Sequence, residues 1–432
     1  MTLFGSVITF QGIAFLMFCV FAIATIGYLL GRITIKGVSL GTAGVFIVAL
    51  LFGCLFYKYL EENTQLYTAN ALKIFYTSNA LKIIETMGLI LFVTSVGFIA
   101  GPNFFSNLKK NFHSYILLGL LIILVGGLFC AACIVFDVKV FGRNMEEAAA
   151  MLVGLLSGSL TSTPAFSAAK ATVNPQLEAI VSVGHGIAYL YGVIGVVLFV
   201  QIIPKILHAN MDEERAHIVI ADTGKKHTYN GKLIEIDSFG FMPFALAAIC
   251  GIVVGGIDWG KIVAYIYYGI AHIFNANMKL PGWSFSLTTT GGCLLISLIF
   301  GHFAHIGRID ITPLEVTLKE FRELGLMLFL IGAGVSGGAS FVKYFKAVYF
   351  IYGIIMTTMP LIIGYLFARY VLHLSLLNNL GSITGGMTST PALGTLIATA
   401  GTENVASAYA ATYPIALIAV VIVSQVLVIL FR

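Results

Sequence analysis

Two copies of the tetrapeptide Thr-Ser-Thr-Pro lie inside apolar, charge-free segments, at 161–164 and 388–391. Proline lacks an N–H and disfavours the helical conformation in the residue before it, so each helix should break at the motif. Ser or Thr ahead of the proline can cap a new helix, whose N-terminus carries free N–H groups and the positive end of the dipole. Such an end suits an anion, typically a carboxylate. The candidate substrate-binding residues are Gly158, Ser159, Thr161, Ser162, Thr163 and Pro164, with Gly385, Gly386, Thr388, Ser389, Thr390 and Pro391.

Small residues and a proline also allow close helix packing and a tolerated kink, which is the alternative interpretation of one such motif. Two copies at equivalent places favour a site, because paired broken helices are the best sequence pointer to the binding site of a secondary transporter.

Few ionisable residues lie near the motifs. Glu178 and Glu403 follow the prolines by 14 and 12 residues, each before the last helix of its half. Each of these glutamates could bind a substrate ammonium or a coupling proton. The alternative is an exposed acid at the start of a helix, which the helix dipole favours. Lys170 is expected to be an exposed lysine of the hairpin; assistance to a substrate carboxylate is the alternative.

Three ring side chains follow the motifs in apolar helices. Tyr189 and Tyr413 occupy equivalent positions and either line a cavity or pack as aromatic residues. His185 is expected to be a hydrogen-bonded packing residue, with a proton relay as the alternative.

The elements that carry these residues are membrane helices. Only 10% of the 432 residues are charged and 59% are hydrophobic, whereas soluble domains carry roughly a quarter charged residues, which excludes a soluble enzyme. The charge-free segments are continuously apolar and reach the roughly 20 residues that a spanning helix needs. The predicted spans are 8–30, 38–57, 86–107, 114–136 and 179–204, then 239–257, 284–306, 324–342, 347–372 and 404–431. The fold class is therefore an all-α polytopic membrane protein.

The chain repeats itself on either side of a polar centre. The matching pairs are 154–166 with 381–393, 44–53 with 292–301, 88–105 with 325–342, and 188–199 with 412–423. We therefore divide the chain into a first membrane repeat, 1–204, a polar linker, 205–237, with a hairpin signal at 227–236, and a second membrane repeat, 238–432. If each motif is a re-entrant segment, each half has five spans, and an odd number inverts the second half. The positive charges do not settle the orientation. The segment 262–278 has no counterpart and is expected to be an interfacial or extra helix.

The segments 27–53 and 88–105, together with the two Thr-Ser-Thr-Pro-Ala motifs, resemble the aspartate–alanine exchanger family of bacterial membrane transporters. The resemblance implies a multi-pass protein of the plasma (inner) membrane that exchanges or exports acidic amino acids, alanine or dicarboxylates. It carries the family motifs onto 158–165 and 385–392. Many members have two soluble regulatory domains between the halves, and 205–237 has no room for them.

We therefore expect alternating access by broken helices that bind a small anionic substrate at mid-membrane. A cation/proton antiporter or channel-like protein on a similar scaffold is the alternative, although the motif segments contain no carboxylate. An intramembrane enzyme is disfavoured, because neither Ser–His nor paired-Asp spacing appears. The expected partners are the small anion and the lipid bilayer. Neither a cofactor, a metal nor nucleic acid is expected, and a homodimer is left open.

Overall fold

The structure, a computed structural model, describes residues 2–3, 8–9, 12–35, 38–39, 42–64, 66–67, 73–75, 77–110, 112–218, 234–258, 261–262, 265 and 286–432. The elements of the first repeat are β1 (Thr2–Leu3), β2 (Ile8–Thr9), α1 (Gly12–Gly31), β3 (Thr34–Ile35), β4 (Val38–Ser39), α2 (Ala43–Thr64), β5 (Leu66–Tyr67), β6 (Lys73–Phe75), α3 (Thr77–Lys110), the π-helix η1 (Phe112–Ile116), α4 (Leu117–Phe141), α5 (Met145–Ser159), α6 (Thr163–Thr172), the 3-10 helix η2 (Pro175–Leu177) and α7 (Glu178–Ile206). After α8 (Met211–Ala216) come α9 (Phe241–Gly255), α11 (Thr288–Phe303), β7 (His305–Ile306), β8 (Ile309–Asp310), α12 (Glu315–Tyr344), α13 (Ala347–Tyr370), α14 (Leu376–Gly386), α15 (Thr390–Ala400), the 3-10 helix η3 (Glu403–Val405) and α16 (Ala406–Leu430). The strands form antiparallel two-residue or three-residue hairpins, β1 with β2, β3 with β4, β5 with β6 and β7 with β8.

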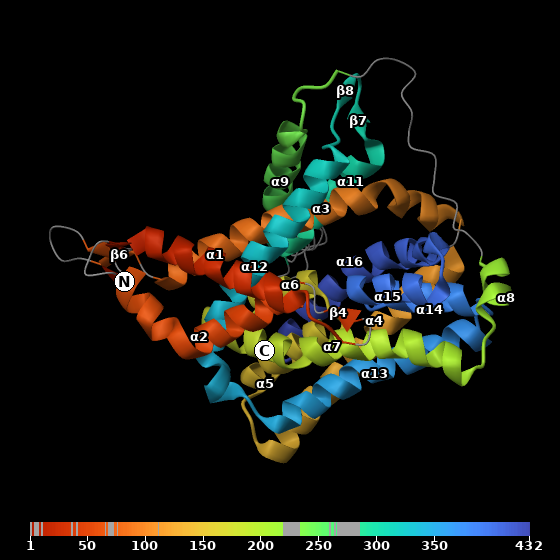
Figure 1. The fold of residues 1–432 in the computed structure, drawn as a ribbon, viewed down its shortest axis with the longest axis horizontal. Helices are drawn as coiled ribbons and strands as arrows, with labels where there is room; N and C mark the ends of the chain where they lie inside the picture. The colour runs from red at the N-terminus through yellow and green to blue at the C-terminus, as the bar shows by residue number, and fades with distance from the viewer. Residues whose placement is uncertain are drawn as a thin grey trace, which may run out of the picture.

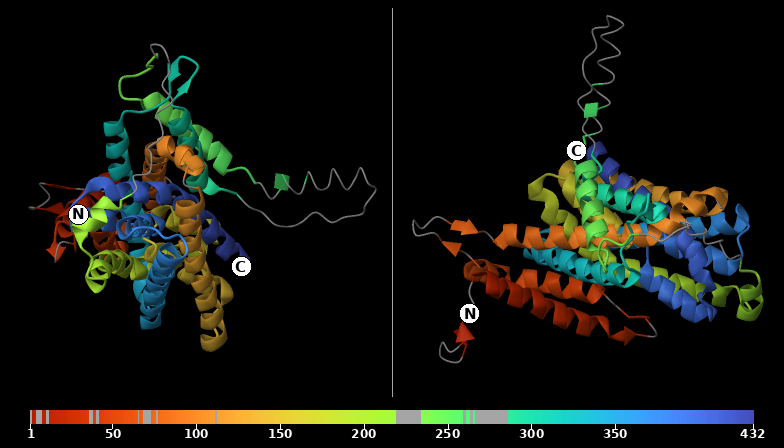
Figure 2. Two further views of the ribbon diagram at one scale, coloured as in Figure 1. Left: turned by 90° about the vertical axis from the view of Figure 1, so that its right-hand side faces the viewer. Right: turned by 90° about the horizontal axis from the view of Figure 1, so that it is seen from above.

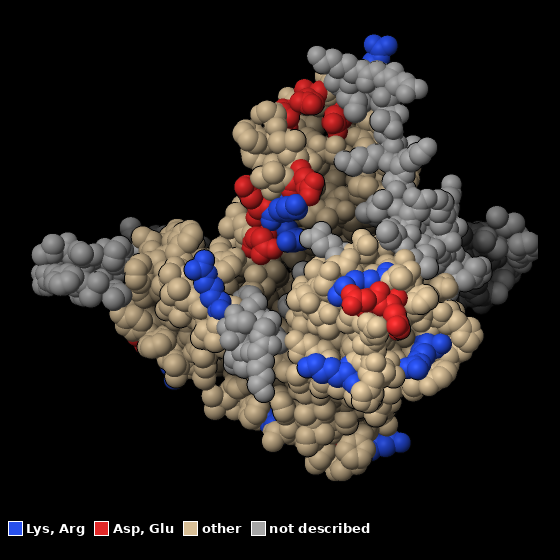
Figure 3. Space-filling model, turned by 45° about the vertical axis from the view of Figure 1, so that its right-hand side comes forward, with Lys and Arg blue, Asp and Glu red and all other residues tan. Residues whose placement is uncertain are grey.

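Each of the ten predicted spans is a helix. Eight helices of the described chain are long and apolar enough to cross a membrane, and the two remaining predicted spans are the shorter helices α9 and α11. Large apolar side chains such as Leu55 and Leu128 are about 70% exposed on the outer faces of these helices, as expected for contact with lipid. On the face that Figure 3 shows, charged side chains form small scattered groups on a largely uncharged surface. The prediction of a polytopic all-α membrane protein is confirmed.

The two repeats are inverted relative to each other. The equivalent helices α3 and α12 cross where Gly88 lies against Gly325, and nearly one turn earlier on α3 Glu85 lies against Gly332. Residue numbers therefore rise along one helix as they fall along the other. Two equivalent helices that run antiparallel relate their repeats by a two-fold axis in the membrane plane, which is the arrangement predicted from five spans per half.

The contacts of the first repeat recur in the second. Gly53 of α2 lies against Val335 of α12, and at the equivalent positions Gly301 of α11 lies against Phe98 of α3. A side chain at either glycine would collide with the neighbouring backbone, so these glycines set how closely the helices approach. The repeat therefore extends from the sequence to the packing.

The helices form two bundles (Figures 1 and 2). The scaffold bundle consists of α1, α2, α3, α9, α11 and α12, which pack mainly on one another. The motif bundle consists of α4 to α7 and α13 to α16 and contains both broken helices. Both bundles take helices from both repeats, so the two motifs come together in one bundle.

The polar linker is described only in part. It contains α8 and a bridge between Ile234 and Ile309, whereas most of the predicted hairpin at 227–236 lies outside the described residues. Nearly all of 262–278, the predicted extra helix, also lies outside them. The end of the linker caps α9: the carboxylate of Asp237 accepts hydrogen bonds from the backbone N–H groups of Phe239, Phe241 and Met242 at 3.0, 2.9 and 2.8 Å.

Candidate functional site

The first motif breaks its helix as predicted. Helix α5 ends at Ser159 and α6 begins at Thr163 with Pro164 in its first turn. Ser162 is the N-cap of α6, and its Oγ accepts a hydrogen bond of 3.3 Å from the backbone N–H of Ala165. Thr161 has φ of 51°, a left-handed conformation that a β-branched residue rarely adopts. The sharp reversal of the chain is therefore made at Thr161.

The second motif repeats this geometry with one difference. Helix α14 ends at Gly386, α15 begins at Thr390, and Thr388 has φ of 52°. Ser389 is the N-cap, but its buried Oγ has no hydrogen-bond partner in the described part of the chain. The side chains of Thr390 and Pro391 lie outside that part. The second break therefore holds an unused hydroxyl where the first holds a capping one.

The two breaks are joined by a reciprocal pair of hydrogen bonds. Thr161 Oγ1 donates to the carbonyl of Met387 at 3.1 Å, and Thr388 Oγ1 donates to the carbonyl of Leu160 at 2.8 Å. Pro164 follows Leu160 by four residues, and Pro391 follows Met387 by four. Neither proline has a backbone N–H that could donate a hydrogen bond. Each motif therefore supplies a hydroxyl to a carbonyl that lies in the other helix break, four residues before the proline of that break.

The small residues of the motifs act in packing. A Cβ on Gly158 would collide with the backbone of α7 at His185, and one on Gly385 would collide with the backbone of α16 at Tyr409. Ser159 Oγ donates to the carbonyl of Gly353 at 3.0 Å, and Gly386 leaves room for Ile122 of α4. These four positions lie behind the breaks and do not line the cavity described next.

A cavity of about 500 Å³ lies in front of the breaks, between the two bundles. The N-terminal ends of α6 and α15 reach it, so two positive dipole ends converge on the same space. It is lined by the motif residues Thr161, Ser162, Thr163, Pro164 and Thr388, by Tyr189, Tyr409 and Tyr413, by Thr42, Phe92, Val96, Ile99 and Ala100, and by Arg322, Glu323, Leu326, Leu393, Ala410, Pro414 and Leu417. Both motifs and both predicted tyrosines thus meet in one cavity.

Arg322 is the cavity residue that sequence reasoning missed. It lies on α12, its guanidinium is 2.8 Å from the carboxylate of the neighbouring Glu323, and both side chains are partly exposed. Its position at the edge of the charge-free segment 324–342 resembled an ordinary span boundary. Extending the repeat alignment by three residues places Arg322 opposite Glu85, which was the available signal.

The other predicted ionisable residues lie elsewhere. Glu178 forms a partly exposed ion pair with Lys82, away from the cavity, and the side chain of Glu403 lies outside the described structure. The expectation that Lys170 is exposed is wrong: its side chain is 3% exposed and its Nζ lies 2.7 Å from a carboxylate oxygen of Glu85. The carboxylate that neutralises Lys170 is 85 residues earlier in the chain, beyond the reach of local sequence patterns.

His185 is a fully buried packing residue. Its ring stacks on Phe166 with centroids 4.2 Å apart, and its Nδ1 is 2.9 Å from Ser157 Oγ. This is the hydrogen-bonded packing role that the sequence predicted.

Comparison with known proteins agrees with this architecture. Residues 19–205 and 243–429 each match a predicted permease membrane region. The chain is 24% identical to a protein of Bacteroides thetaiotaomicron named an uncharacterized transporter, over 549 aligned positions that cover 95% of this chain and 97% of that protein. It is 25% identical to a protein of the same description from Rhodopirellula baltica, over 95% of this chain and 98% of that one.

These relatives carry segments that the present chain lacks, since the alignments are longer than its 432 residues. With both membrane repeats matched, the chain belongs to the aspartate–alanine exchanger family of transporters.

Proposed function

We propose that this protein is an antiporter or exporter of small anionic metabolites, such as acidic amino acids or dicarboxylates, in the bacterial plasma membrane. The observation that carries the proposal is the cavity in which both helix breaks meet Arg322. Its volume of about 500 Å³ lies within the range of about 300–1,000 Å³ that is typical of small-molecule sites.

Different cavity residues can contribute different interactions to the binding of an anion. Thr163 lines the cavity, and its hydroxyl can donate to a carboxylate oxygen. Thr161 and Thr388 also line the cavity, but their single hydroxyl protons are given to the carbonyls of Met387 and Leu160, so these two residues hold the breaks in place. The N-termini of α6 and α15 add fixed positive potential. Arg322 supplies a guanidinium that can bind a carboxylate, and in the structure this guanidinium is paired with Glu323 at 2.8 Å. The anion enters from one face, and movement of the motif bundle against the scaffold bundle delivers it to the other.

Counterflow in proteoliposomes tests the assignment. Vesicles loaded in turn with aspartate, glutamate, alanine, succinate or fumarate identify the substrate, and Arg322→Gln is then compared with wild type. Loss of the guanidinium removes a charge-assisted contact, so the apparent affinity for the anion should fall by about tenfold or more. Arg322→Lys should retain part of it, because the charge remains while the forked geometry is lost.

The matched control is Lys319→Gln on the same helix. Lys319 is 60% exposed and pairs with Glu315 outside the cavity, so this variant should transport like wild type. Thr163→Val adds a second arm, since it removes a cavity hydroxyl and should abolish counterflow in a folded protein. Equal affinity of Arg322→Gln and wild type, together with undiminished exchange by Thr163→Val, would refute the site.

One observation favours the alternative function of a cation/proton antiporter: Glu323 places a carboxylate at the cavity. Flux driven by a sodium or proton gradient in vesicles without any organic anion would favour that alternative.

A further inference from the structure

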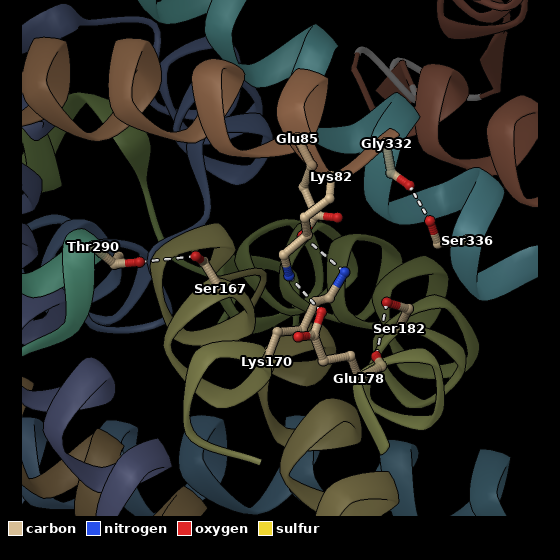
Figure 4. Close-up of polar contacts among 9 residues, drawn as sticks. All are labelled: Lys82, Glu85, Ser167, Lys170, Glu178, Ser182, Thr290, Gly332 and Ser336. Carbon is tan, nitrogen blue, oxygen red and sulfur yellow. Dashed lines mark hydrogen bonds and ion pairs between the residues drawn. The ribbon is translucent and has the colours of Figure 1, made fainter. Parts of the chain in front are cut away.

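One face of the contact between the two bundles is closed by a buried ion pair. Glu85 of α3, in the scaffold bundle, and Lys170 of α6, in the motif bundle, have side chains that are 7% and 3% exposed. Figure 4 shows these side chains pointing toward each other, with the more exposed pair Lys82 and Glu178 beside them. Helix α6 is attached to the scaffold at a second point, where Ser167 Oγ lies 2.8 Å from Thr290 Oγ1 of α11.

The internal symmetry shows what these attachments correspond to in the other half. In the repeat alignment, Ser167 and Lys170 are equivalent to Gly394 and Ile397, while Thr290 and Glu85 are equivalent to Thr42 and Arg322. Thr42 and Arg322 line the open cavity, and among the residues that the structure describes no atom lies within 4 Å of a Cβ built on Gly394. The positions that are joined in one half are therefore separated by open space in the other.

The packing of the long helices differs in the same way. On the joined side, Gly337 of α12 lies directly against Ser182 of α7. The position equivalent to Gly337 is Ala100 of α3, and it lines the cavity. Glu85 lies at the level of Gly332, which is ten residues along α12 from Arg322, or about 15 Å of helix. The joined side and the open side are thus at different depths, on opposite sides of the crossing of α3 and α12.

We propose that Glu85, Lys170, Ser167 and Thr290 form the closed gate of a second access cavity, which opens to the opposite membrane face when the first one closes. This proposal rests on the alternating access of the proposed function. An ion pair suits such a gate because the interaction between two buried charges roughly balances the loss of their hydration. On opening, water replaces the partner of each charge, so the gate can separate without exposing a large apolar surface.

Cysteine labelling tests the gate without knowledge of the substrate. Val96 lines the open cavity and is 5% exposed, whereas its equivalent Ala333 lies outside the cavity lining and is completely buried. Val96→Cys and Ala333→Cys, in a background free of native cysteines, are therefore matched probes. A membrane-impermeant thiol reagent applied from one face should label position 96, and labelling at 333 should be slow and come from the other face.

Glu85→Gln leaves Lys170 buried without its counter-charge, so labelling of Ala333→Cys should rise by about tenfold or more. The control Lys82→Gln removes one charge of the more exposed neighbouring pair and should change labelling by less than about twofold. Labelling at 96 and 333 from the same face, or no increase in Glu85→Gln, would overturn the proposal.

A cross-link gives an independent measurement. Ser167→Cys with Thr290→Cys places two sulfurs where the native oxygens are 2.8 Å apart, so oxidation should lock the gate. Counterflow should stop after oxidation and return after reduction, whereas Ser167→Cys alone should be insensitive to both. Continued counterflow through cross-linked protein would refute the gate. Absence of counterflow in wild type for every anion would refute the proposed function and leave the labelling results intact.

Discussion

The hydrogen bond from the Thr388 hydroxyl to the first motif should have a measurable effect on the free energy of unfolding. Thr388→Val keeps the shape of the side chain and removes the donor to the carbonyl of Leu160, which lies 2.8 Å away in the buried core. Pro164 stands where the helical donor would be, so no backbone N–H at that position can replace the hydroxyl. An unsatisfied buried carbonyl costs about 1–3 kcal/mol. Interhelical hydrogen bonds in membranes average about 0.6 kcal/mol because partners are often replaced, and Pro164 has no N–H with which to replace this one.

The assay is reversible unfolding of the purified protein in detergent micelles. Thr388→Val should lower the free energy of unfolding by about 1–3 kcal/mol. Thr388→Ser keeps the donor and removes the β-branch that opposes φ of 52°, so it should be at least as stable as wild type. The control is Thr399→Val, because the Thr399 hydroxyl donates to the carbonyl of Thr395 within the same helix, α15. If Thr388→Val unfolds like the control, or Thr388→Ser loses as much as Thr388→Val, the reciprocal bonding does not hold the two breaks together.

Two further outcomes follow from the fold. Gly158→Val should prevent α5 from packing against α7 and should reduce the yield of folded protein in size-exclusion chromatography. Gly256→Ala is the control and should not reduce the yield, because the nearest described atom to a Cβ at that position is 3.4 Å away. At Asp237, hydrogen bonds from the backbone N–H groups at the start of α9, that of Met242 first, lower the pKa of the carboxyl. Its stabilising effect should be complete above the ordinary aspartate pKa of about 3.9 and be lost as the pH falls through the lowered folded-state value. The difference in thermal stability between wild type and Asp237→Asn should therefore shrink on acidification; a difference that grows in acid would contradict the capping role.

Local patterns were sufficient to predict the helices and their interruptions. Charge-free length located the ten spans, and the prolines at 164 and 391 placed the breaks, because both effects act within a few residues of backbone. The odd number of spans per half predicted the inversion. These features depend on the length of each apolar segment, on the hydration of charged side chains and on the steric effect of proline, all of which follow from the local sequence.

The pairing of side chains between bundles was beyond these patterns. The sequence predicts an exposed Lys170, whereas packing places it against Glu85. Arg322 has the pattern of a residue at the end of a span, whereas the fold places it in the cavity beside the helix breaks. The exchange of hydroxyls between the two motifs joins residues more than 220 positions apart. Each of these depends on which helices become neighbours, a property of the whole fold.

The crossing of α3 and α12 at Gly88 and Gly325 joins two equivalent surfaces, so it is self-complementary in the manner of a two-fold dimer interface. A contact of this kind needs no covalent connection between its partners. Two separate half-length chains inserted in opposite orientations would meet through the same glycine surface. The fold thus has the form of an antiparallel dimer whose two subunits are joined in one chain. Because each half has its own sequence, equivalent positions can hold different residues: Arg322 on one side of the crossing is matched by Glu85 on the other.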